Sequence, residues 1–131
     1  MQAVARWLWL WGPPVGEMAA LFWISSLPDI TIPGGASDKT AHFAAFFALA
    51  ALALRAAAGG RWSGVNARSA AVAFAIAAGY GALDELHQML TPGRFPGVDD
   101  WVADASGAAT AVLLVLLAAA FVRRRRGNRS V

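Results

Sequence analysis

Three stretches of this 131-residue chain, each at the edge of an apolar segment, are rich in polar side chains. They contain acids, histidines, an arginine, a lysine and a glutamine. Three pairs among them are spaced four residues apart, so each pair would share one face of a helix. Together, such side chains could bind a phosphate, hold a metal ion or transfer protons. The candidate site residues are Asp38, Lys39, His42, Asp84, Glu85, His87, Gln88, Arg94, Asp100 and Asp104.

Two kinds of chemistry suit these residues. The guanidinium of Arg94 is a fork that matches a phosphate, and Lys39 or protonated histidines would add positive charge. Alternatively, the acids with His42 and His87 would hold Mg²⁺ or supply acid–base groups for phosphoryl chemistry. Mg²⁺ is the only cofactor that the residues suggest, and the sequence contains no nucleophile elbow and no P-loop. The absence of cysteine excludes disulfides, thiol chemistry and cysteine-ligated metal sites.

The composition indicates the surroundings of these polar residues. The chain is 58% hydrophobic and 15% charged, whereas soluble domains average about 25% charged residues. A soluble chain this short has a large surface to keep wet, and these charges are too few for it. We therefore expect one membrane-embedded domain over residues 1–131.

Four apolar segments are candidates to span a bilayer core, which takes about 20 helical residues. Residues 105–122 contain no charge and form the clearest of them. The second and third segments reach spanning length only when the polar candidates at one end are included. The sequence predicts an all-α, four-transmembrane-helix bundle with spans over 7–27, 39–58, 69–90 and 101–122 and a basic tail over 123–131.

The first span is the least regular. Trp7 and Trp9 suit an interfacial aromatic belt. Pro13 and Pro14 would start or kink its helix, and Glu17 would fall in the first turns or deeper. A signal peptide is the alternative reading, but these residues interrupt the apolar stretch and no Ala-x-Ala-like cleavage site follows it.

Charges in the short loops predict the orientation. Residues 28–38 hold Asp29 and Asp38 and no cation, whereas residues 55–68 hold three arginines and no acid. Positive residues mark the cytoplasmic side, so both termini are expected there and the candidate site on the extracytoplasmic side of the plasma (inner) membrane. Residues 1–122 carry six cations against eight acids, so the basic tail is expected to flank a membrane and not to bind nucleic acid.

In this topology, three helix ends bring the candidates to one level, about 4–9 Å inside those ends. Ionised groups that face lipid are costly, so they should turn toward one another. Asp84 and Glu85 point about 100° apart, so one would face the cluster and the other a second helix or the headgroups. The turn over residues 91–97, with its two prolines and two glycines, would set Arg94 over the mouth of the cluster.

A purely structural reading stays open beside the chemical one. The acids of the third span would then pair with Arg94 or Lys39 and hold the helices together, and His42 would be a hydrogen-bond donor in the core. The glycines expected to permit close helix packing are Gly79, Gly81 and Gly107.

Three blocks of the sequence resemble the VanZ-like family of small bacterial integral membrane proteins. The blocks are residues 25–28 (Ser-Ser-Leu-Pro), residues 37–46 with the pattern Asp-Lys-x-x-His-x-x-x-Phe, and residues 84–107 with Asp-Glu-x-x-Gln, Pro-x-Arg, Asp and Gly. One position departs from the family pattern, which usually has asparagine where this chain has Asp104. Either an acid substitutes for the amide there, or a neutral, protonated Asp104 supplies the hydrogen bonds of that amide.

The resemblance implies a multi-pass protein of the bacterial envelope and no particular reaction. The family is named for a protein linked to teicoplanin resistance, so a link to glycopeptide resistance is an expectation. Our leading hypothesis is that the cluster binds the headgroup of an envelope lipid or a lipid-linked cell-wall precursor. The alternatives are a metal-dependent enzyme acting on a lipid phosphate and a structural or assembly partner in the membrane. Each of these roles is compatible with an oligomer.

Overall fold

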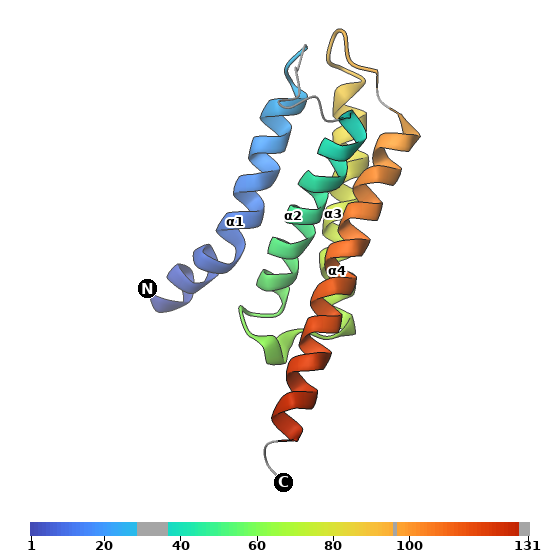
Figure 1. Cartoon of the computed structure of the whole chain (residues 1–131). Helices are drawn as coiled ribbons and strands as arrows, with labels where there is room; N and C mark the ends of the chain where they lie inside the picture. The colour runs from blue at the N-terminus through green and yellow to red at the C-terminus, as the bar shows by residue number, and fades with distance from the viewer. Residues whose placement is uncertain (29–36, 96, 129–131) are drawn as a thin grey trace.

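The computed structural model describes residues 1–28, 37–95 and 97–128, and within them the chain is helical without strands. The elements are α1 (Gln2–Ser25), α2 (Asp38–Ala57), the short 3-10 helix η2 (Trp62–Gly64), α3 (Ala67–Gln88) and α4 (Val98–Gly127). The four long helices alternate in direction, so the start of α1 and the end of α4 lie at the same end of the molecule (Figure 1). Asp29, Pro96 and Arg129, on which some of the charge and turn predictions rest, lie outside the described residues.

Three of the helices are long and apolar enough to cross a membrane, namely α2, α3 and α4. This confirms the all-α class and the membrane character of the chain. Helix α1 has 24 residues, enough to reach across a bilayer core, but it does not meet the same standard of apolarity. A fourth span therefore stays a prediction.

Helix α1 begins at Gln2, and Pro13 and Pro14 lie inside it and not at its start. A proline inside a helix removes a backbone hydrogen bond and clashes with the preceding turn. Figure 1 shows the corresponding change of direction within α1. The N-terminal part of α1 consequently leans away from the other helices.

Local capping explains where two helices begin. The Ser37 hydroxyl accepts a hydrogen bond from the backbone N–H of Thr40 at the start of α2. At the start of α3, Asn66 and Ser69 form a reciprocal capping box. These caps satisfy backbone N–H groups that a helix start otherwise leaves without a partner.

The core lies between α2, α3 and α4 and consists mainly of small side chains. Its main cluster contains Phe46, Leu49, Ala50, Ala77, Ala108 and Ala111. Small residues allow helix backbones to approach closely, which is how helices associate in lipid. Helix α1 packs outside this core, against α2 and α3.

Two of the three glycines that were expected to permit close helix packing do lie against a neighbouring helix. A Cβ atom on Gly107 would lie 2.2 Å from the backbone oxygen of Phe43 in α2, and one on Gly81 would lie 2.8 Å from Oδ2 of Asp104. Gly79 has nothing within 4 Å of that position, so the expectation of close packing was wrong there. The α2–α4 crossing and the space for Asp104 both require glycine.

We expect Gly107→Ala to destabilise the bundle, because its methyl group would force α2 and α4 apart. Overpacking of this kind costs about 1–3 kcal/mol. Thermal unfolding in detergent would show a lower midpoint for Gly107→Ala, and Gly79→Ala serves as the control because its methyl group would enter open space. Equal midpoints for the two variants would contradict the packing described for Gly107.

Candidate functional site

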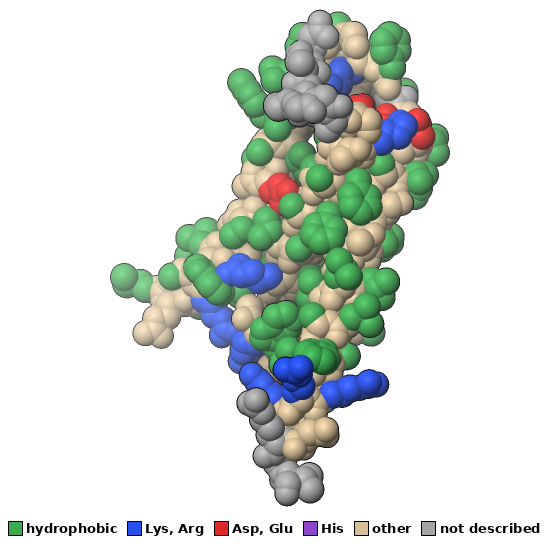
Figure 2. Space-filling view, viewed as in Figure 1, with side chains coloured by type: hydrophobic (Ala, Val, Ile, Leu, Met, Phe, Trp, Pro, Cys, Tyr) green, Lys and Arg blue, Asp and Glu red, His purple; other side chains and the backbone are tan. Residues whose placement is uncertain are grey.

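The polar candidates lie at the end of the bundle formed by the N-terminal turns of α2 and α4 and the C-terminal turn of α3. Figure 2 shows most Lys and Arg side chains toward the opposite end, and acids beside a few basic groups at the upper end. The two ends of the bundle therefore differ in the sign of their charges.

The centre of the site is a contact between α2 and α4. Nδ1 of His42 lies 2.9 Å from Oδ1 of Asp104, at hydrogen-bonding distance. The His42 ring is 9% exposed and Asp104 is fully buried. The second carboxylate oxygen of Asp104, Oδ2, has no hydrogen-bond partner among the described residues and faces Gly81 on α3.

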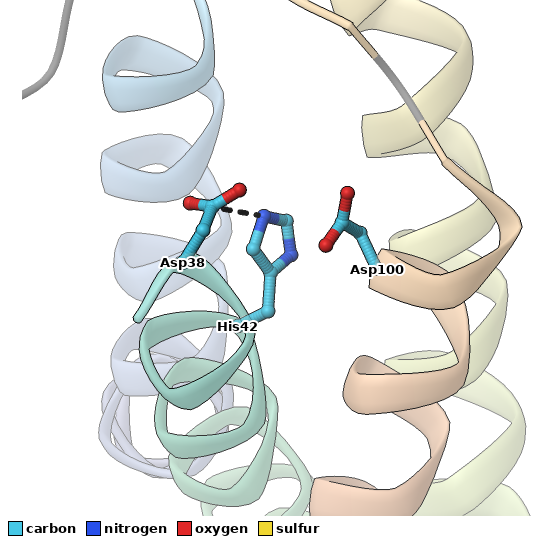
Figure 3. A group of neighbouring side chains, drawn as sticks. All are labelled: Asp38, His42 and Asp100. Atoms are coloured by element: carbon cyan, nitrogen blue, oxygen red, sulfur yellow. Dashed lines mark ion pairs between the residues drawn. The ribbon is translucent and has the colours of Figure 1, made fainter. Parts of the chain in front are cut away.

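A second contact lies nearer the helix ends. Nζ of Lys39 lies 2.5 Å from Asp99 and 2.7 Å from Asp100, both in the first turn of α4. Negative charge is favourable at a helix N-terminus, so these acids stabilise α4 as well as the α2–α4 contact. Asp38 is 4.0 Å from Nε2 of His42, and Figure 3 shows the Asp38 and Asp100 carboxylates on either side of that ring.

The neighbouring acids of α3 have different partners. Asp84 accepts a hydrogen bond from Nε2 of Gln88 at 2.9 Å, and Glu85 accepts one from the backbone N–H of Gly97 at 2.9 Å. Each keeps one buried oxygen without a partner among the described residues. Neither acid pairs with Arg94 or Lys39 in the part of the chain that the structure describes. The expectation that these acids hold the helices together by pairing with Arg94 or Lys39 is therefore not supported.

A cavity of about 160 Å³ opens beside this site, several times the volume of a water molecule. It is lined by Leu21, Ile24, Ser25, Asp38, Ala41, His42, Ala45, Phe46, Asp84, Gln88 and Arg94. Arg94 is half-buried and forms no ion pair with any described residue. Its guanidinium, with five N–H donors, thus belongs to a residue that lines a cavity together with carboxylate and amide side chains.

His87 contacts α1 through both its ring nitrogen and its ring face. Its Nε2 is 2.9 Å from the Ser26 hydroxyl, and its ring stacks on Phe22 with the centroids 4.3 Å apart. Both partners belong to the C-terminal end of α1, so His87 connects α1 to α3. It belongs to neither of the two described groups of side chains that are close enough to share a metal ion.

Sequence reasoning missed two partners in this site. Asp99 binds Lys39 but is not among the candidate site residues, although an acid at the start of an apolar helix could have indicated it. The backbone N–H of Gly97 binds Glu85, and no side-chain pattern indicates a backbone partner twelve residues away.

Helices that can cross a membrane, with acids and bases packed together at one end, define a helical membrane protein with a polar site. The model of the VanZ/LLP1 family matches residues 10–119, so the chain belongs to this family. The match confirms the resemblance seen in the three sequence blocks. No curated protein and no solved structure matches the chain.

Lys39→Met should lower the thermal unfolding midpoint in detergent, because it leaves the nearly buried carboxylate of Asp100 without its cation. Asp99→Asn is the matched control, since the Asp99 side chain is largely exposed and its loss should matter less. The two variants are compared at the same salt concentration. A midpoint lowered equally by both, or by neither, would contradict the role assigned to the Lys39–Asp100 contact.

Proposed function

We propose that this protein binds the phosphate-bearing headgroup of an envelope lipid or of a lipid-linked cell-wall precursor. The observation that supports this function is the cavity in which Arg94 is half-buried without an acidic partner among the described residues. Arginine pairs with phosphate through two parallel hydrogen bonds, which are among the stronger polar contacts in proteins.

The surroundings of Arg94 favour it over Lys39 as the phosphate ligand. Lys39 already contacts two carboxylates, so its charge is balanced within the protein. It is also not among the residues that line the cavity. His42 lines the cavity and would add a hydrogen bond from Nε2.

The acids in the same cavity indicate what else the headgroup carries. Asp38 and Asp84 line it, and one oxygen of Asp84 is buried without a partner among the described residues. Carboxylates accept hydrogen bonds and do not donate them when ionised. A headgroup with hydroxyl or ammonium donors next to its phosphate would satisfy both Arg94 and these acids.

The charge distribution supports an extracytoplasmic position for the cavity. The arginines of the η2 region and of the C-terminal end of α4 lie at the opposite end of the bundle (Figure 2). Short segments rich in arginine stay on the cytoplasmic side. With α1 as the fourth span, both chain ends would be cytoplasmic and the cavity would face the outer leaflet of the plasma membrane.

The orientation can be tested directly because the chain contains no cysteine. We expect a membrane-impermeant maleimide to label Phe95→Cys in intact spheroplasts, and Ser63→Cys only after permeabilisation. Both positions are exposed and lie at opposite ends of the bundle. Labelling of Ser63→Cys in intact spheroplasts, with Phe95→Cys protected, would place the cavity on the cytoplasmic side and overturn this topology.

Native mass spectrometry of the purified protein would test the headgroup site. Arg94→Ala should reduce the amount of retained lipid by about tenfold or more, since a charge-assisted hydrogen bond contributes about 1.5–3 kcal/mol. Arg124→Ala removes an exposed arginine at the opposite end and is the matched control. Equal lipid retention by wild type, Arg94→Ala and Arg124→Ala would show that Arg94 does not hold a headgroup.

Chemistry on a lipid phosphate is a second candidate function. It is favoured by two groups of side chains, both containing His42, whose potential ligand atoms lie within 4.8 Å of one another. A metal ion there would be next to the cavity that contains Arg94. An assembly role and a link to glycopeptide resistance stay expectations from the sequence.

A further inference from the structure

We propose that His42, Glu85 and Asp104 bind one divalent transition-metal ion, with Zn²⁺ as the best fit, between α2, α3 and α4. One potential ligand atom from each of these side chains lies within 4.8 Å of the others. Each comes from a different helix, so the ion would connect the three helices of the core. This inference concerns the ion alone and does not depend on headgroup binding.

Unpartnered buried oxygens support this site. Oδ2 of Asp104 and Oε1 of Glu85 are both buried and have no hydrogen-bond partner among the described residues. Asp104 itself is fully buried. A buried polar atom without a partner is costly, and a cation is the partner that carboxylate oxygens accept most readily.

The distances suit metal ligands after small side-chain adjustments. Nδ1 of His42 and Oδ1 of Asp104 are 2.9 Å apart. Two atoms bonded to one tetrahedral ion at about 2.0–2.1 Å each would be separated by about 3.3 Å, slightly more than this. The ion would then replace the hydrogen bond between these two side chains, with His42 in its neutral form.

The third ligand is already held in position. Oε2 of Glu85 accepts the backbone N–H of Gly97 at 2.9 Å, which fixes the carboxylate and leaves Oε1 free. A hydrogen bond to a ligating carboxylate is a usual part of metal sites. Gly81, one turn before Glu85, leaves the room into which Oδ2 of Asp104 points.

Charge balance favours a divalent cation. Two carboxylates and a neutral imidazole carry a charge of −2, which one divalent ion would neutralise within an apolar bundle. The imidazole nitrogen of His42 selects Zn²⁺ or a similar transition metal, because Mg²⁺ prefers oxygen ligands and water. The structure thus favours a different ion from the Mg²⁺ that the sequence suggested.

A second group, Asp38, His42 and Asp100, also has its potential ligand atoms within 4.8 Å of one another and lies nearer the helix ends (Figure 3). Here the positive charge is already supplied, because Lys39 contacts Asp100 at 2.7 Å. The Asp38 side chain is also 59% exposed, so its carboxylate can stay hydrated. The inner group is therefore the better site for an ion.

The test uses the purified full chain in detergent, stripped with EDTA and equilibrated with Zn²⁺ or Mg²⁺. Elemental mass spectrometry should find about one Zn²⁺ per wild-type chain. Zn²⁺ but not Mg²⁺ should raise the thermal unfolding midpoint of the wild-type protein. Glu85→Gln should weaken Zn²⁺ binding by about tenfold or more, whereas Asp99→Asn, the matched surface control, should bind as wild type does.

Three results would overturn the proposal. The first is that the wild-type protein neither retains Zn²⁺ nor gains thermal stability from it. This result does not depend on the folding of any variant. Another is unchanged Zn²⁺ affinity in folded Glu85→Gln. The third is loss of Zn²⁺ in Asp38→Asn with retention in Glu85→Gln, which would move the ion to the outer group. Arg94→Ala should keep Zn²⁺ while losing lipid, so the metal and headgroup proposals can fail separately.

Discussion

Burial of ionisable side chains between apolar helices is the constraint on which this structure depends. The contact between His42 and Asp104 lies at the α2–α4 crossing, where Asp104 is fully buried and His42 nearly so. Such groups are tolerated only when they meet one another or a bound partner, because lipid offers no hydrogen bonds. Gly81 and Gly107 make that meeting possible by removing the Cβ atoms that would keep the helices apart.

The remaining polar groups are of two kinds: charges that are neutralised within the protein, and charges that are not. Lys39 neutralises the acids at the start of α4, and its contacts hold α2 to α4. Arg94 has no comparable partner among the described residues and lines a cavity instead. A half-buried arginine without such a partner forms no ion pair that would stabilise the bundle, and the proposed headgroup binding rests on this feature.

Helix α1 is peripheral to the core yet forms one wall of the cavity through Leu21, Ile24 and Ser25. Specific polar contacts hold it in place: the Tyr80 hydroxyl donates to the backbone of Met18, and Arg55 donates to the backbone of Trp9 and lies over its ring. Only the partly buried Met18 and Leu21 of α1 pack against the main core cluster among the described residues, so α1 serves as a wall of the cavity more than as part of the core.

The sequence by itself determined the helical class, the membrane character and the residues that gather at one end, because apolar length and four-residue spacing depend only on the order of residues. Of the three glycines that the sequence predicted to be closely packed, the structure confirms two, Gly81 and Gly107. Only the tertiary structure decided which acid meets which base. Side chains one residue apart on a helix face different neighbours, so Asp84 lines the cavity while Glu85 binds the backbone of Gly97. His87 likewise contacts Ser26 at the end of α1, because the packing of α1 on α3 determines which side chain lies next to it.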